Sequence, residues 1–224
     1  MAGWNFRKLF ILFMANIKSD PDQKKETESI LNNYILQDKI GSGSFSKVYR
    51  IIEKGTNKIY AAKISLNAIR EETYDLYKNI SREVNIISKL NHPSILKFLF
   101  YSPFNFKGKT KPVIVTEYAS NGSLSKLIEH DRLQPNNPIL NDTRKLIIIY
   151  GIASAMSYLH SHNFLHRDLK PDNILLDDFL LPKVADFDLS KMSQSSNGFS
   201  FMKTTVEVIK GTPMYIAPEI WSNC

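Results

Sequence analysis

Residues 166–173 are HRDLKPDN, and this short stretch decides how the rest of the chain is interpreted. An aspartate, a lysine and an asparagine stand at positions 168, 170 and 173, a proline interrupts the run, and the apolar residues ILL follow at once. Surface loops are usually polar, but solubility alone does not require this order of groups. The stretch therefore predicts a loop that carries chemistry, placed directly before an apolar segment.

Two more motifs follow the first one along the chain, KVADFDLSK at 183–191 and GTPMYIAPE at 211–219. Aspartates on two adjacent, strand-flanked loops, together with Asn173, offer the hard oxygen ligands that Mg²⁺ prefers. This part of the sequence therefore predicts a magnesium site.

Before residue 120 the pattern is that of a small sheet with one helix. Five segments mix apolar and polar residues as β-strands do. They are 34–40, 47–54, 59–65, 95–101 and 112–118. Between the third and fourth, Ile80, Val84 and Ile87 recur at helical spacing, and Pro93 is expected to end that helix.

After residue 122 the character becomes helical. The segment 146–159 is densely apolar and predicts a mostly buried helix, with Asn141 or Asp142 capping its start. The expected fold is α+β, with a β-rich lobe before a helical one and the change near residues 120–122.

The turn GSGSFS at 41–46 joins the first two predicted strands. Gly41 and Gly43 remove side chains where a backbone must come close to a ligand. A turn between two strands differs from the strand–turn–helix arrangement of dinucleotide-binding folds. Taken alone, the turn is more typical of an ordinary hairpin than of a ligand-binding loop.

Two charged residues, Lys63 and Glu83, lie on neighbouring predicted elements and have opposite charge. Lys63 lies in YAAKI near the end of the third predicted strand, and Glu83 lies on the helix after it. A lysine near nucleotide phosphates needs a counter-charge to hold its ammonium group, which a helix glutamate supplies. Each residue alone is also compatible with a solvated surface charge.

Taken in order, GSGSFSKV, AAK, the helix glutamate, HRDLKPDN, DFD and APE resemble the motifs of eukaryotic protein kinases from residue 34 to the end of the chain. The resemblance implies a leader at 1–30, an N-lobe with hinge at 34–119 and a partial C-lobe at 120–224. The expected fold is thus α+β and two-lobed, with an incomplete helical C-lobe.

The resemblance implies specific roles. Asp168 would orient the substrate hydroxyl, Lys170 would steady the transferring phosphoryl group, and Asn173 and Asp186 would hold Mg²⁺. The remaining residues would bind ATP. They are Ile40, Gly41, Gly43, Val48, Ala61, Lys63 with its partner Glu83, Thr116 as gatekeeper, Glu117 and Ala119 of the hinge, and Leu175.

Lys170, two residues after the aspartate, and the pair Gly211-Thr212 resemble kinases specific for Ser/Thr, and VTEYASNGSL and DLSK resemble the tyrosine-kinase-like group. Arg167 is placed as in kinases whose activation loop is ordered by phosphorylation. Its candidate partners are Ser193, Ser195, Ser196, Ser200, Thr204 and Thr205. An apolar column is also implied. It consists of Ile87, Phe98, His166 and Phe187.

Three departures keep a second hypothesis open. Ser46 stands where the third glycine is usual, Asp188 replaces the glycine of DFG, and the chain ends five residues after Glu219. Without the helices that follow in the family, apolar surface of the 146–159 helix is expected to be exposed. The alternative to an active Ser/Thr kinase is therefore a catalytically impaired remnant that binds nucleotide or acts as a scaffold.

Composition sets the outer limits. The chain has 224 residues, a formal net charge of +7 and one cysteine, Cys224, which fits an intracellular setting. Its basic residues are spread out, so a nucleic-acid partner is not expected. The leader, with the apolar run 9–15 after Arg7 and Lys8, leaves three possibilities open. These are a pre-domain or gene-model extension, an amphipathic contact with a membrane surface, and a signal peptide.

Overall fold

The computed structural model describes residues 30–68, 74–192 and 211–221, with side-chain detail absent at 74–79, 192, 219 and 221. The chain divides into two compact units. The first consists of 1–68 and 101–113, and the second of 69–100 and 114–224. Residues 1–29 of the predicted leader lie outside the described residues, and the predicted lobe boundary near residue 120 stays a prediction.

The first unit is built on antiparallel strands, as the alternating sequence predicts. They are β1 (Tyr34–Ser42), β2 (Ser46–Glu53) and β3 (Ile59–Ser65). In this register Val48 pairs with Lys63 and Arg50 with Ala61. Alternate residues point to opposite faces, so Val48, Ala61 and Lys63 share one face. Ile51 and Ala62 belong to the other face and are fully buried.

Strands β4 (Phe98–Ser102) and β5 (Val113–Glu117) complete a five-stranded sheet in the order β1-β2-β3-β5-β4. The prediction of a strand from residue 95 is wrong for its first residues. Ile95 instead forms an isolated parallel bridge with Val184, and the amide of Leu96 donates to the Val184 carbonyl at 2.9 Å. The backbone groups of Ile95 and Leu96 therefore find hydrogen-bond partners outside the five-stranded sheet.

The predicted helix before that strand is α3 (Tyr74–Ile87). It ends before Pro93, because its last turn tightens rather than continuing. The amides of Lys89 and Leu90 donate three residues back, to the carbonyls of Ile86 and Ile87. Such a closing turn satisfies the last carbonyls of a helix without a proline.

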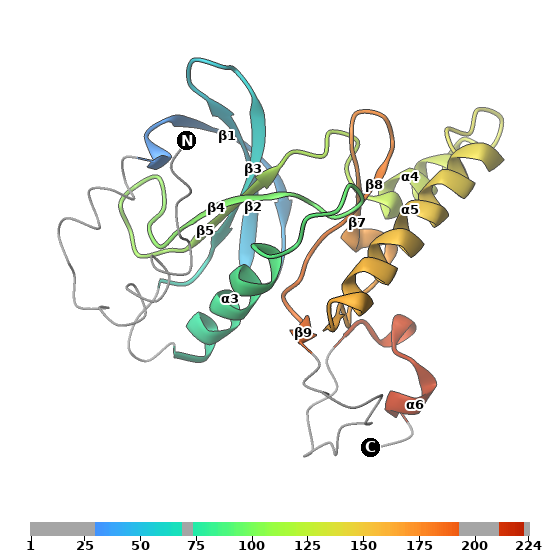
Figure 1. The fold of residues 1–224 in the computed structure, drawn as a ribbon. Coiled ribbons are helices and arrows are strands. Elements are labelled where there is room, and N and C mark those ends of the chain that lie inside the picture. Colours follow the sequence, from blue (N-terminus) through green and yellow to red (C-terminus); the bar gives the residue numbers. More distant parts are fainter. Residues whose placement is uncertain (1–29, 69–73, 193–210, 222–224) are drawn as a thin grey trace. The chain divides into compact units, whose positions relative to one another are not determined.

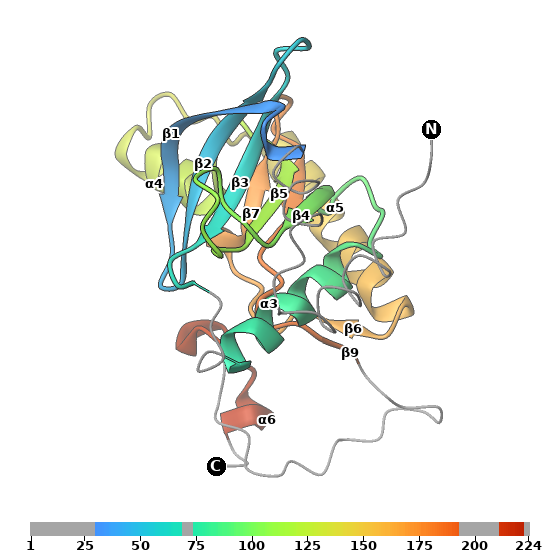
Figure 2. The same cartoon turned by 90° about the vertical axis from the view of Figure 1, so that its left-hand side faces the viewer.

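The second unit is centred on two helices, α4 (Leu124–Leu133) and α5 (Asp142–Ser161). Figure 1 shows them with the hairpin of β7 (Ile174–Leu176) and β8 (Pro182–Val184), and Figure 2 shows the same elements from the side. Their apolar side chains form one core. It contains Leu127, Ile148 and Leu176, with Leu124, Ile139, Leu140, Ile152 and Leu180 packed against it.

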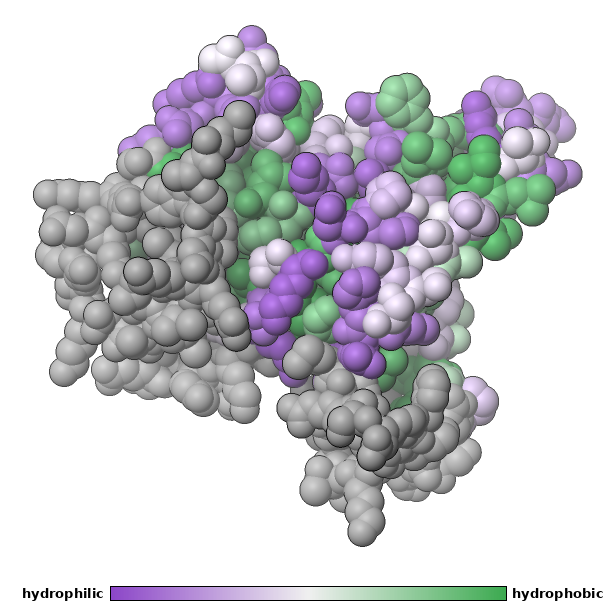
Figure 3. All heavy atoms as spheres, viewed as in Figure 1, coloured by the Kyte–Doolittle hydropathy of each residue, from purple (hydrophilic) through white to green (hydrophobic). Residues whose placement is uncertain are grey.

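Asn141 caps α5, as predicted, since its side chain accepts the amide of Arg144 at 2.9 Å. The prediction that this helix is mostly buried is wrong, because only one of its apolar faces meets the core. The opposite face is exposed, with Leu146 at 67% and Tyr150 at 77%. Figure 3 shows apolar surface gathered where α4 and α5 lie. The expectation that part of this helix would be exposed is thus confirmed.

Gly151 explains how closely α5 approaches β8. A Cβ built on it lies 2.4 Å from Cγ of Pro182 and 3.1 Å from Oγ of Ser94. Only glycine fits this contact without displacement of the neighbours. No described helix is both long enough and apolar enough to cross a membrane.

Candidate active site

Two short strand pairs hold the chemistry-bearing loops side by side in the second unit. Strand β6 (Phe164–Leu165) pairs with β9 (Lys191–Met192), and β7 pairs with β8. The loop 166–173 and the segment 185–190 are therefore tied together at both ends. Their backbones also bond directly, since the amide of Ala185 donates to the carbonyl of Asn173 at 2.9 Å.

His166 is buried and connects the loop 166–173 to the segment 185–190. It is 2% exposed, its Nε2 lies 3.0 Å from the Ala185 carbonyl, and its ring centroid lies 5.0 Å from that of Phe187. Burial lowers its pKa, so the ring is neutral at pH 7, with Nε2–H donating. The contact confirms the His166–Phe187 part of the predicted column, while the places of Ile87 and Phe98 in it stay predictions.

Asp168 is the hub of the site. Its side chain is 10% exposed, and Lys170 Nζ lies 2.8 Å from its Oδ2. Asn173 Nδ2 donates to the same oxygen at 3.0 Å and to the Asp168 carbonyl at 2.8 Å. The other oxygen, Oδ1, accepts from Thr212, from the hydroxyl at 2.8 Å and from the amide at 3.1 Å. Four donors thus meet one carboxylate.

These donors decide the charge of Asp168. Burial raises its pKa, but the hydrogen bonds from Lys170, Thr212 and Asn173 lower it by more, so the pKa lies below the ordinary value. Asp168 is consequently anionic at neutral pH, the charge state suited to accepting a hydrogen bond from a hydroxyl group.

Thr212 is the residue whose role the sequence did not reveal. Its hydroxyl also accepts from Lys170 Nζ at 2.6 Å, so it bridges the lysine and the aspartate. Gly211 makes this possible. It adopts φ +136°, and a Cβ there would lie 3.2 Å from the carbonyl of Arg167. The pair Gly211-Thr212 suggested a substrate class, but nothing in the sequence linked it to a residue 44 positions away.

Asn173 and Asp186 were predicted as magnesium ligands, and their chemistry fits that ion. Asn173 is buried and uses its amide nitrogen twice as a donor, which leaves the amide oxygen for a cation. Asp186 is exposed and adopts φ 63°, the left-handed region that asparagine and aspartate tolerate better than most residues.

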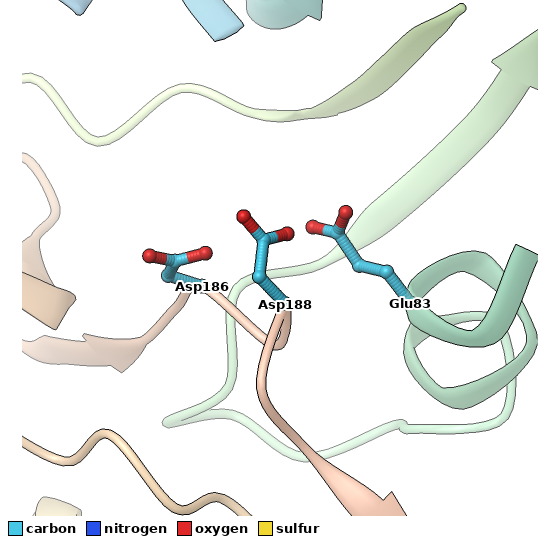
Figure 4. Close-up of side chains that lie close together, drawn as sticks. All are labelled: Glu83, Asp186 and Asp188. Atoms are coloured by element: carbon cyan, nitrogen blue, oxygen red, sulfur yellow. The ribbon is translucent and has the colours of Figure 1, made fainter. Parts of the chain in front are cut away.

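Asp186 also belongs to an acidic cluster. Figure 4 shows its carboxylate beside those of Glu83, from α3, and Asp188. One oxygen of each lies within 4.8 Å of the others, and Glu83 is buried. Asp188 is not among the described residues with positive φ, so the backbone conformation here does not demand glycine. What Asp188 changes is the local charge.

The predicted hinge and its neighbours lie in the second unit. The Thr116 hydroxyl donates to the Glu117 carbonyl at 3.1 Å, and the Glu117 amide donates to the Lys97 carbonyl at 2.9 Å. The binding of a base by Glu117 and Ala119 stays a prediction. Leu175 lies in β7 and forms an isolated bridge with Ser123.

The other predicted nucleotide residues lie in the first unit. Gly41 pairs with Val48, and Ile40 falls at a register shift of β1. A Cβ on Gly41 would make an ordinary 3.5 Å contact with Val48, and one on Gly43 would lie 3.8 Å from Ser46. Packing therefore does not require these glycines. A close approach by a ligand remains the hypothesis for them.

Two predictions stay predictions. Lys63 and Glu83 belong to different units, and their pairing stays a prediction. The serines and threonines proposed as partners of Arg167 lie at 193–205, outside the described residues.

Comparison with known proteins places these features in a family. Residues 34–224 match the family model described as protein kinase domain. The chain is 32% identical to a probable serine/threonine-protein kinase, fhkA, of Dictyostelium discoideum, over 89% of this chain and 32% of that protein. It is 36% identical to human NUAK family SNF1-like kinase 1, over 86% of this chain and 26% of that protein.

A third relative is the serine/threonine-protein kinase fused of Drosophila melanogaster, 33% identical over 85% of this chain and 21% of the relative. The chain therefore spans about a third or less of the length of these curated relatives.

Proposed function

The chain belongs to the protein kinase family, and from this premise we propose that it transfers the γ-phosphoryl group of Mg-ATP to Ser or Thr hydroxyls of a protein. The observation that carries the proposal is the set of donors around Asp168. An aspartate kept anionic in a partly buried site is suited to orient a hydroxyl and receive its proton.

Each residue has a part in this reaction. Asp168 accepts the hydrogen bond of the incoming hydroxyl, and Lys170, fixed between Asp168 and Thr212, supplies positive charge beside the transferring group. Asn173 and Asp186 hold Mg²⁺, which neutralises phosphate charge when bound. The chain thus contributes positioning and charge neutralisation rather than covalent chemistry.

Nucleotide binding is assigned to the residues that the resemblance implies. The face of β2 and β3 with Val48, Ala61 and Lys63 serves the base and the α- and β-phosphates. Gly41 and Gly43 leave room for phosphates, and the backbone of 117–119 binds adenine. The single cysteine supports an intracellular setting, where ATP is abundant.

Asp188 favours a second candidate function, that of a nucleotide-binding or scaffold protein with impaired transfer. A third carboxylate within 4.8 Å of those of Asp186 and Glu83 alters the charge that meets the metal. This candidate predicts Mg-dependent binding of ATP without transfer.

The decisive experiment compares the chain with Asp168→Asn in transfer of labelled phosphate from [γ-³²P]ATP to a mixture of basic proteins, with analysis of the labelled amino acid. Transfer to Ser or Thr that falls about 10²- to 10⁴-fold in the variant supports the proposal. A Mg-dependent rise in melting temperature with ATP, equal in both proteins and without transfer, supports the scaffold function instead.

A further inference from the structure

Glu117 carries a side chain that the proposed reaction does not use, although its backbone belongs to the segment assigned to adenine. Its Oε1 accepts the amide of Lys97 at 2.9 Å and lies 3.4 Å from Nζ of Lys183. The backbone of Glu117 returns the contact to Lys97 through its own amide, also at 2.9 Å. Both the side chain and the backbone amide of Glu117 are thus held by contacts within the protein.

Lys183, the ion-pair partner of Glu117, is a largely buried lysine. It lies in β8 opposite Leu175 of β7, its side chain is only 15% exposed, and a second carboxylate, Asp177 Oδ2, lies 3.9 Å from its Nζ. A lysine this far out of water needs opposite charge nearby, and the loss of one partner leaves the other charge uncompensated. Such a pair restrains position more than an exposed pair does.

Asp177 is itself held in a fixed orientation. Its Oδ1 accepts the amides of Phe179 and Leu181 at 3.0 and 2.9 Å, which closes the turn between β7 and β8. The ion pair thus links the last residue of β5 to the β7–β8 hairpin, whose turn Asp177 closes. Lys183 stands three residues before Asp186, the proposed metal ligand.

We propose that Glu117 and Lys183 are positioning residues, whose ion pair holds the backbone of 117–119 in the conformation that binds adenine. The inference rests on the proposed function, because it assumes that this segment meets a nucleotide. Preorganisation of a binding segment raises affinity by removing the entropy cost of ordering it. The pair should therefore act on ATP affinity and leave the bonds to Asp168 unchanged.

The test uses Glu117→Gln, Lys183→Met and the double variant. Glutamine keeps an oxygen for the Lys97 amide and removes the charge, so it isolates the ion pair. The dissociation constant of ATP with Mg²⁺, measured by calorimetry, should rise about three- to tenfold in each single variant. It should rise no further in the double variant, because both changes break the same interaction.

Lys145→Met is the matched control. Lys145 pairs with Asp142 at 3.0 Å on the exposed surface of α5, so its loss should leave ATP affinity unchanged. Single variants that bind ATP as the unaltered chain does, or effects that add in the double variant, would overturn the inference.

Amide hydrogen exchange separates this inference from the proposed function, because it needs no nucleotide. Without ATP, the amides of 118–120 should exchange faster in Glu117→Gln and Lys183→Met than in the control. Unchanged exchange overturns the positioning role even if ATP binds. Failure of the unaltered chain to bind Mg-ATP, with faster exchange in the variants, instead overturns the proposed function and with it the role toward adenine.

Discussion

Asp168 and Asp188 are 20 residues apart in sequence, yet their carboxylates have different neighbours. Asp168 is surrounded by donors, with Lys170, Asn173 and Thr212 all within 3.1 Å of its carboxylate oxygens. Asp188 has other acids close by, since its carboxylate lies within 4.8 Å of those of Asp186 and Glu83. The carboxylate of Asp168 thus accepts several hydrogen bonds, whereas the carboxylate of Asp188 lies in a group of three acidic side chains.

The difference shows how a loop assigns roles to identical residues. Donors fix both the charge and the direction of Asp168, which a group that orients a hydroxyl requires. Carboxylates that gather repel one another, and a bound cation relieves that repulsion. Substitutions that remove a donor from the first region, or an acid from the second, should therefore have different consequences.

Among substitutions of the residues around the two aspartates, the largest effect is expected at Thr212, which contributes two of the donors. Thr212→Val removes the hydroxyl that joins Asp168 to Lys170, and the rate of phosphoryl transfer should fall about 10- to 100-fold because both side chains lose their fixed positions. Thr212→Ser keeps the hydroxyl and should recover most of the rate. Equal rates for the valine and serine variants would contradict the bridging role.

The next effect concerns a substitution outside both regions. It acts on β8, the strand that precedes Asp186 and Asp188 in the chain. Gly151→Ala places a methyl group 2.4 Å from Pro182 Cγ, next to Lys183 of β8. The free energy of unfolding in urea should fall by about 1–3 kcal/mol, as expected for overpacking. Ser157→Ala, at an exposed position of the same helix, should change it by about 0.5 kcal/mol or less.

The smallest effect is expected at Asp188. Its removal lowers the negative charge near Asp186, so the Mg²⁺ concentration for half-maximal ATP binding should rise about two- to fivefold in Asp188→Asn. Asp188→Gly should give the same shift, because the backbone here does not require glycine. A shift in the glycine variant alone would mean that backbone freedom, not charge, governs this position.

Much of the fold followed from local patterns, and what did not depended on distant contacts. Asn141 as a helix cap and the positions of β2 and β3 follow from side-chain chemistry within a few residues. The exposed face of α5 did not follow from hydropathy, because Leu146 and Tyr150 are apolar whether or not anything covers them, and it was expected only from the resemblance to protein kinases. Hydropathy records what a side chain prefers, whereas burial also depends on neighbours from elsewhere in the chain.

The site shows the same division. The motif HRDLKPDN predicted Asp168, Lys170 and Asn173 as site residues, and the structure brings Lys170 and Asn173 to the carboxylate of Asp168 within one loop. The contribution of Thr212 could not be predicted, since it depends on a glycine backbone that packs on Arg167. Asp188 stands where the resemblance implies a glycine, but the positive φ lies two residues earlier, at Asp186.

The pH dependence of phosphoryl transfer tests whether donors from two segments keep Asp168 anionic. The reaction needs the anion, so the rate should fall as the pH drops through the pKa of Asp168, which the bonds from Lys170 and Thr212 hold below its ordinary value. Thr212→Val removes one of those bonds and raises that pKa. The acid limb of its rate profile should therefore move to higher pH than in the unaltered chain, whereas an unmoved limb, or one shifted to lower pH, would contradict the role assigned to the network.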